Sequence, residues 1–374
     1  MADPISEDVT PSQRAALGLS LGACFALAPV AVSLACGAPP EAPAPAPTAR
    51  SFGGEARAPA APPLPKGVDP LPRKLWVQPE SPVLEVAEAL RPKHPDDAEL
   101  LDRLANEPTA IWLGGWTKDP KKTVAGIVSA AAKEEAIPVL VPYNIPNRDC
   151  GQYSAGGEAG AKAYKKWIGD VAAGLGQHPA IVILEPDSLT VMDCLTDLGM
   201  DERLALLGDA VTALSADKQA RIYLDGGHPN ALPVDEMAAR LQAAGVERTR
   251  GFALNVSNFV STKDNVRYGE ALAARLGTAQ YVVDTSRNGR GASGDWCNPF
   301  GRALGEEPST HTGLAHADAY LWVKRPGESD GACHGGPPAG KFWGAYALEL
   351  AKASWEPELK AVADDDAKAT PRRR

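Results

Sequence analysis

The sequence predicts an α/β fold, a distorted TIM-like barrel of about seven parallel strands. Seven short apolar runs recur along the chain, and segments with helical periodicity separate most of them. Because these runs are continuously apolar, they fit strands that are buried on both faces, as in a parallel sheet. A strand–helix repeat of about 30–40 residues is typical of α/β proteins. Seven such units favour a closed barrel over the alternative, an open doubly wound sheet.

The expected strands are rich in Val, Ile, Leu or aromatic residues. They cover residues 109–113, 137–143, 180–185, 221–225, 251–255, 280–284 and 319–324. Other segments show apolar residues at helical spacing, which predicts a helix over each. These segments are 96–106, 122–134, 158–174, 202–215, 234–243 and 263–276.

Residues 1–36 are expected to direct export. Residues 15–35 carry no charged side chain and follow Arg14, as in the charged and apolar regions of a secretory signal. Residues 33–36 (SLAC), followed by Gly37, resemble a bacterial lipobox, in which Cys36 is lipidated after cleavage. We therefore expect a secreted or cell-surface protein that is anchored to a membrane by a lipid on Cys36.

The rest of the chain divides into a spacer, one folded domain and a tail. Residues 37–72 are rich in Pro and Ala and lack hydrophobic periodicity, which is typical of a semi-rigid linker. Residues 359–374 are strongly charged and are expected to form a disordered tail. The predicted catalytic domain is therefore residues 73–358, and we expect it to be a monomer.

The composition and the missing motifs argue against several classes of function. A formal net charge of −9 disfavours nucleic acid as a partner, because a phosphate backbone attracts clustered Lys and Arg. The six cysteines form neither a CxxC pair nor a cluster with zinc spacing, so no metal is expected. The chain has no HExxH or Walker motif. We expect no organic cofactor.

Nearly every expected strand ends in polar or aromatic residues. They are Trp112, Tyr143 with Asp149, Glu185 with Asp187, Asp225 with His228, Asn255, Asp284 with Arg287, and Lys324 with Glu328 and Asp330. One such residue could be a helix cap, but the carboxyl ends of barrel strands converge on one mouth, where barrel enzymes place their chemistry. Several carboxylates with Trp and Tyr suit glycoside hydrolysis, which needs one protonated and one ionised carboxyl group.

Two stretches make this prediction specific. Residues 141–151 (VPYNIPNRDCG) and 181–189 (IVILEPDSL) closely resemble the two signatures of glycoside hydrolase family 6, the inverting cellulases. Further similar stretches follow in the same order: YLDGGH at 223–228, NVSN at 255–258, DTSRNG at 284–289, GDWC at 294–297 and WVKRPGESDG at 322–331. The resemblance covers roughly residues 75–355 and implies a partner that is a β-glucan polysaccharide.

The resemblance implies a catalytic role for four residues. Asp187 would be the proton donor, and Asp149 would raise the pKa of the donor and help to organise the attacking water. Asp330 is the candidate base, although it could instead be a salt-bridge partner for Lys324 or Arg287. Tyr143 would press on the sugar at the cleavage point and favour a distorted ring, which resembles the transition state.

The resemblance also implies a set of substrate-binding residues. Two tryptophans would stack on sugars, Asp225 would support the site electrostatically, and Ser154 would position the attacking water. The remaining residues would bind hydroxyl groups. The full set is Trp112, Ser154, Asp225, His228, Asn255, Trp296, Lys324 and Glu328.

The family pattern pairs the cysteines of the domain. Cys150 matches a disulfide with Cys194, and Cys297 matches one with Cys333, which requires an oxidising compartment. One departure is Ala231, which stands where family members usually carry a tryptophan on the acceptor side. The short segment 333–342 favours an open cleft, because tunnel-forming relatives extend loops there.

Together these features predict an exported, inverting endoglucanase that cleaves internal β-1,4 bonds without a cofactor. One alternative is a cellobiohydrolase or a hydrolase of another β-glucan. An alternative of a different class is a non-catalytic surface protein that binds glucan.

Overall fold

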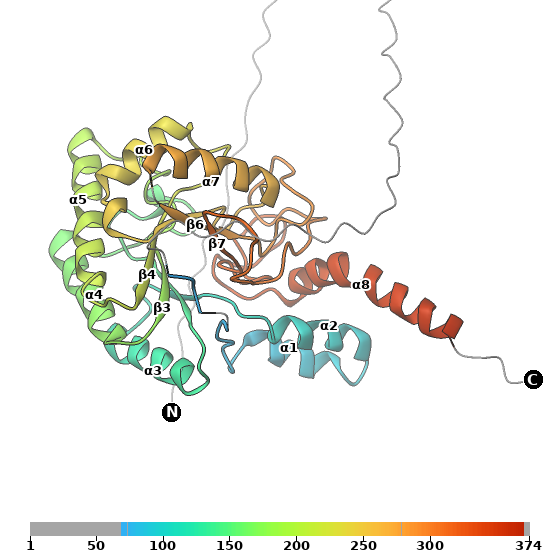
Figure 1. Ribbon diagram of the computed structural model, residues 1–374. Coiled ribbons are helices and arrows are strands. Elements are labelled where there is room, and N and C mark those ends of the chain that lie inside the picture. Colours follow the sequence, from blue (N-terminus) through green and yellow to red (C-terminus); the bar gives the residue numbers. More distant parts are fainter. Residues whose placement is uncertain (1–68, 73, 278, 370–374) are drawn as a thin grey trace, which may run out of the picture. The chain divides into compact units, whose positions relative to one another are not determined.

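The computed structural model describes residues 69–72, 74–277 and 279–369 (Figure 1). The expected export signal, with Cys36, and nearly all of the expected linker lie outside the described residues. Leu71, which the sequence analysis places in the linker, is buried in the interior of the sheet among strand residues. The folded region therefore begins before residue 73.

Seven parallel strands form one sheet in the order in which they occur in the chain. They are β1 (Ile111–Leu113), β2 (Val139–Pro142), β3 (Ala180–Leu184), β4 (Ala220–Asp225), β5 (Gly251–Leu254), β6 (Gln280–Asp284) and β7 (Ala317–Leu321). All seven predicted strands are confirmed, most with ends one to three residues away from the expected positions.

The two edge strands, β1 and β7, meet at a single isolated bridge between Thr109 and Trp322. The Ala110 N–H donates to the Trp322 carbonyl at 3.0 Å, and the Trp112 indole N–H donates to the Val323 carbonyl at 2.8 Å. We call this junction the seam. The predicted distorted barrel is confirmed. The distortion lies at the seam, where β1 and β7 are joined by a few hydrogen bonds and not by a full ladder.

Helices alternate with the strands along the chain (Figure 1). The six expected helices correspond to α2 (Pro95–Ala105), α3 (Pro120–Lys133), α4 (Ala161–Leu175), α5 (Asp197–Leu214), α6 (Val234–Ala243) and α7 (Thr262–Leu276). Two further helices, α1 (Pro82–Leu90) and α8 (Gly344–Ala369), were not expected. The structure assigns helix up to Ala369, where the sequence analysis expects a disordered tail.

Each strand separates two apolar layers, as its unbroken hydrophobic sequence requires. On β3, Val182 and Leu184 pack in the layer beneath α3 to α7, whereas Ile181 and Ile183 pack in the interior of the barrel. Side chains alternate between the faces of a strand, so both faces must be apolar when both are covered. Burial of each such side chain contributes about 1.5–3 kcal/mol.

A third apolar cluster joins α1, α2 and α8 beside the seam, around Trp322, Trp355 and Tyr346. The indole rings of Trp322 and Trp355 stack with centroids 6.4 Å apart. The helices that the sequence analysis missed thus cover the edge of the sheet next to β7. No helix among the described residues is both long and apolar enough to span a membrane.

A charged cluster fixes the strands at the end of the barrel opposite to the carboxyl ends. Asp318 on β7 accepts two hydrogen bonds from Arg250, at 2.6 and 2.7 Å, and one from the Tyr223 hydroxyl at 2.6 Å. The Asp318 side chain is only 2% exposed. Removal of one partner from a buried ion pair leaves the other charge uncompensated, which is strongly destabilising.

We therefore expect Asp318→Asn to lower the free energy of unfolding by about 3–5 kcal/mol, measured by urea denaturation. The matched control is Asp235→Asn, whose partner Arg275 lies with it at the surface and for which a loss below about 1 kcal/mol is expected. Equal losses in the two variants would contradict a role for the buried pair in holding β4, β5 and β7 together.

Candidate active site

The polar residues predicted at the strand ends do lie at the carboxyl ends of the strands. Glu185 and Asp187 follow β3, Asp225 ends β4 and Asn255 follows β5. Glu185, Asp187 and Asn255 have φ values of 49°, 65° and 64°. Residues other than glycine seldom adopt this left-handed region, and such strain tends to cluster at functional sites.

Asp187 is the carboxyl group best placed to hold a proton. Its backbone N–H donates to the Asp225 carboxylate at 2.8 Å. Burial, followed by the charges of Asp225 and Asp149, raises the pKa of Asp187 to about 8. Burial also raises the pKa of Asp225 to about 7. Among the described residues neither carboxylate forms an ion pair, and Lys324 only partly offsets the raised pKa of Asp187. Asp187 therefore remains protonated at neutral pH and can act as a general acid.

Asp149 lies on the loop after β2, and a short turn ties it to Ser154. The Ser154 N–H donates to the Asp149 carboxylate at 2.8 Å. Burial raises the pKa of Asp149, although this hydrogen bond and the charge of Arg148 oppose the shift. The structure thus brings Asp149 and Ser154 together, as the sequence analysis expects.

Arg148 anchors this loop, a role that the sequence analysis missed. Its guanidinium donates to the carbonyls of Tyr143 and Ser154 at 2.6 and 2.8 Å. It also lies over the ring of Tyr143, at 4.4 Å from the centroid, and over that of Trp116, at 5.5 Å. The sequence feature that could have indicated this role is the position of Arg148 directly before Asp149 in the RDC stretch.

Tyr143 and Trp112 form the wall of the site next to the seam. Their rings meet edge to face with centroids 5.2 Å apart. Burial, followed by the charges of Asp187 and Asp149, raises the pKa of the Tyr143 phenol. The hydroxyl therefore stays protonated, and its electrostatic coupling to both carboxylates places it at the predicted centre of the site.

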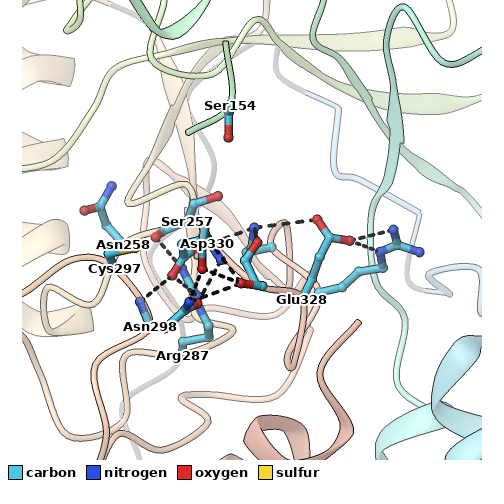
Figure 2. Close-up of polar contacts among 12 residues, drawn as sticks. Ser154, Ser257, Asn258, Arg287, Cys297, Asn298, Glu328 and Asp330 are labelled. Carbon is cyan, nitrogen blue, oxygen red and sulfur yellow. Dashed lines mark hydrogen bonds and ion pairs between the residues drawn. The ribbon is translucent and has the colours of Figure 1, made fainter. Parts of the chain in front are cut away.

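Asp330 lies in a polar network that keeps it ionised (Figure 2). Its carboxylate accepts from Arg287 at 2.8 Å and from the Asn298 N–H at 3.0 Å, and Lys324 lies 3.4 Å away. Burial alone would raise the pKa of Asp330, but Arg287 and Lys324 outweigh it and the pKa is lowered. The ion pairing that the sequence analysis names as the alternative to catalysis is thus present.

Lys324 and Glu328 belong to the same network. The Lys324 ammonium lies 3.6 Å from Glu328, and Arg325 donates to Glu328 at 2.8 Å. The backbone N–H of Lys324 donates to Asp284 at 3.0 Å, and so does that of Ser257. Asp284 therefore ties the loops after β5 and β7 together, which the sequence analysis did not foresee.

Asn255 does not fit the sugar-binding role that the resemblance implies. Its side-chain amide donates to the Asp284 carbonyl at 2.8 Å, and its oxygen accepts from the Val260 N–H at 3.1 Å. The residue is completely buried. Since its hydrogen-bonding groups already bind the backbone, we correct its role to shaping the loop after β5.

His228 is half-buried, and its Nδ1 accepts from the Asn230 N–H at 3.3 Å. Burial lowers its pKa, so the imidazole is neutral at pH 7 and Nε2 carries the proton. A groove of about 700 Å³ opens beside this loop. Its lining includes Pro229, Asn230, Ser261, Asp264, Arg267 and Tyr268.

Glu185 is a further buried acid to which the sequence analysis gave no role. Its carboxylate accepts from the N–H groups of Asn144 and Ile145 at 2.9 and 3.0 Å. Burial raises its pKa to about 7. Glu185 thus fixes the chain that follows Tyr143, and its position at a strand end was the available signal.

Both expected disulfides are confirmed. Cys150 bonds to Cys194 and Cys297 bonds to Cys333, across 44 and 36 residues of chain. The first joins the loops after β2 and β3, and the second joins the loops after β6 and β7. Trp296, next to the second disulfide, is 49% exposed and presents a free ring surface at the mouth. Among the described residues no cluster of His, Cys, Asp and Glu could hold a metal.

The sequence matches the family model for glycosyl hydrolases family 6 over residues 72–354. It is 46% identical to Endoglucanase A of Cellulomonas fimi over 263 residues, which is 69% of this chain and 57% of that protein. It is 43% identical to Endoglucanase 1 of Streptomyces halstedii over 256 residues, which is 66% of this chain and 79% of that protein. The chain thus spans little more than half of the Cellulomonas relative.

The fold is similar to that of the endoglucanase Cel6 from Mycobacterium tuberculosis, solved in complex with methyl-cellobiosyl-4-deoxy-4-thio-β-D-cellobioside. The TM-score is 0.72 at 46% identity, and the match covers 75% of this chain and 97% of that one. A cellobiohydrolase, Cel6A from Chaetomium thermophilum, matches at 27% identity with a TM-score of 0.64. By its sequence and its fold, this chain belongs to glycosyl hydrolases family 6.

Proposed function

We propose that this protein is an inverting endo-β-1,4-glucanase that cleaves internal bonds of cellulose or a related β-glucan, with Asp187 as proton donor. The observation that carries the proposal is the contrast between two acids at one mouth, one half-buried and one buried. Asp187 has a raised pKa and no cation at its carboxylate, whereas Asp330 is paired with Arg287 and has a lowered pKa. Glycoside hydrolysis by inversion needs one acid of each kind. Relatives named endoglucanases support the choice of substrate.

In the proposed mechanism Asp187 gives its proton to the leaving oxygen while water attacks the opposite face of the sugar. Asp330 is ionised, but its Oδ2 already accepts from Arg287 and Asn298, and its Oδ1 lies 3.4 Å from the Lys324 ammonium. It would therefore take up the proton of the attacking water through a second water and not directly. Ser154 and Asp149, which are hydrogen-bonded to each other, would hold the attacking water.

The aromatic surfaces support a polymeric substrate that lies along the cleft. Trp112 and Trp296 would stack on the apolar faces of sugars, and Tyr143 would press on the ring that is cleaved. The groove beside the loop of His228 is lined by Pro229 and Asn230 of that loop and by residues of α7. Ala231 offers no ring on that side, so we propose a soluble or mixed-linkage β-glucan, and not crystalline cellulose, as the preferred substrate.

We also propose that the protein is exported and acts as a monomer, held at the cell surface by a lipid on Cys36. Two disulfides support an oxidising compartment. The apolar stretch at 15–35 and the lipobox-like SLAC at 33–36 support export and the lipid anchor.

Asp187→Asn is expected to lower kcat on soluble carboxymethyl cellulose by about 10²- to 10⁴-fold, because it removes the general acid. Release of reducing ends and the fall in viscosity are measured together, since internal cleavage lowers viscosity early. The matched control is Asp193→Asn, an exposed residue on the neighbouring loop, which should keep full activity. Unchanged turnover in Asp187→Asn would refute the assignment.

The activity is expected to fall as pH rises through about 8, because Asp187 must be protonated to act. Asp225 is the charge that contributes most to the raised pKa of Asp187 after burial. Asp225→Asn should therefore lower the pKa of Asp187 and move the alkaline limb of kcat/KM to lower pH. If the alkaline limb of kcat/KM lies at the same pH in Asp225→Asn as in the wild type, a group other than Asp187 is responsible for it.

A proton NMR time course on a soluble β-glucan is expected to show the α-anomer of the product first, because inversion places the attacking water on the opposite face. The β-anomer should then appear only at the rate of mutarotation. Initial release of the β-anomer would show retention and exclude the proposed roles of Asp187 and Asp330.

A further inference from the structure

Tyr153 lies at the tip of the loop that carries Asp149 and Ser154, and it has no role in the mechanism above. Its side chain is 53% exposed. Its ring contacts that of Trp296, with centroids 5.9 Å apart and planes tilted by 58°. Trp296 belongs to the loop after β6, whereas Tyr153 belongs to the loop after β2. The pair therefore links two loops that lie far apart in the sequence.

The ring of Tyr153 also packs on Gly331. A Cβ atom placed on Gly331 would lie 2.5 Å from Cγ and 2.6 Å from Cδ1 of Tyr153, distances that real Cβ atoms essentially never show. Gly331 is not among the glycines with positive φ. The glycine is therefore required by the close approach of the ring and not by its backbone conformation. Gly331 directly follows Asp330, so Tyr153 contacts the chain beside the candidate base.

The base of the same loop is held separately. Arg148 donates from its backbone to Gly156 at 3.1 Å and from its guanidinium to the carbonyl of Ser154 at 2.8 Å. The disulfide of Cys150 with Cys194 fixes the loop further along its length. These bonds keep the loop on its own side of the site. The ring of Tyr153 reaches across to the opposite side, which carries Asp330 and Trp296.

We propose that Tyr153 is a positioning residue, which docks the 149–156 loop on Gly331 and Trp296 and so holds Asp149 and Ser154 in place for the attack of water. This inference rests on the proposed hydrolysis of β-glucan and deepens it. The contact between two half-exposed rings is weak enough to break and re-form in each catalytic cycle. An internal segment of glucan could then enter when the rings part.

The first test is Tyr153→Ala, assayed on a soluble cello-oligosaccharide. The expected result is a fall in kcat of about 10- to 100-fold, as for displaced catalytic groups, with a change in KM of less than about three-fold. Tyr153→Phe should restore kcat, since the ring and not the hydroxyl makes the contacts. The control is Phe300→Ala, which removes a ring of equal exposure that packs on Trp343 and His334, and which should keep wild-type values.

The second test uses Gly331→Ala in two backgrounds. In the wild type its methyl group would displace the ring and lower kcat. In Tyr153→Ala the two closest atoms, Cγ and Cδ1, are gone and only Cβ remains, at 3.0 Å, so the same methyl should have a much smaller effect. Additive losses in the double variant, or a wild-type kcat in Tyr153→Ala, would overturn the inference.

A readout without substrate separates this inference from the proposed function. The Ser154 amide is hydrogen-bonded to Asp149, and its hydrogen exchange should be faster in Tyr153→Ala than in Tyr153→Phe because the undocked loop opens more often. Equal exchange rates would overturn the docking itself. A different outcome is faster exchange in Tyr153→Ala together with a wild-type protein that cleaves no β-glucan. In that case the docking of the loop stands, and the proposed function fails together with the role of the docking in hydrolysis.

Discussion

Repulsion among the carboxylates gathered at one end of the sheet is the constraint on which the rest of the site depends. The charges of Asp225, Asp149 and Asp330 all raise the pKa of Asp187 there, and burial makes each charge more costly. Cations decide which group ionises. Arg287 and Lys324 lie beside Asp330, whereas Asp187 has the Asp225 carboxylate as its neighbour, to which its own backbone N–H donates. The division between acid and base therefore follows from where two cations are placed.

The fold supplies this arrangement because parallel strands bring the ends of distant segments to one edge. Asp284 shows how tightly that edge is built, since it accepts N–H groups from the loops after β5 and β7. Asn255 and Glu185 serve the same purpose at their own strand ends. Several polar residues at the mouth are thus scaffolding that sets the positions of a few reactive groups.

The strands and the strand-end acids could be predicted because their signals are local: unbroken apolar runs that end in Asp or Glu. The disulfide pairing and the seam-side wall of Tyr143 and Trp112 were accessible through the family resemblance. Helices α1 and α8 were missed because their apolar faces pack on each other and on Trp322, which no short window reveals. The ion pair of Asp330 with Arg287, 43 residues away, was named only as one of two alternatives, because the sequence does not show which cation lies beside the carboxylate. Asn255 was misassigned because its bonding groups face the backbone.

The seam between β1 and β7 is where the strands of the barrel are held together by the fewest hydrogen bonds. One of the few hydrogen bonds across the seam runs from the indole N–H of Trp112 to the carbonyl of Val323. The face of the same indole ring belongs to the proposed sugar platform. A glucan ring stacked on Trp112 would restrict the motion of its side chain and so stabilise the hydrogen bond that crosses the seam. Substrate would then stiffen the barrel as well as occupy it, which links occupancy of the cleft to the resistance of the whole domain to unfolding.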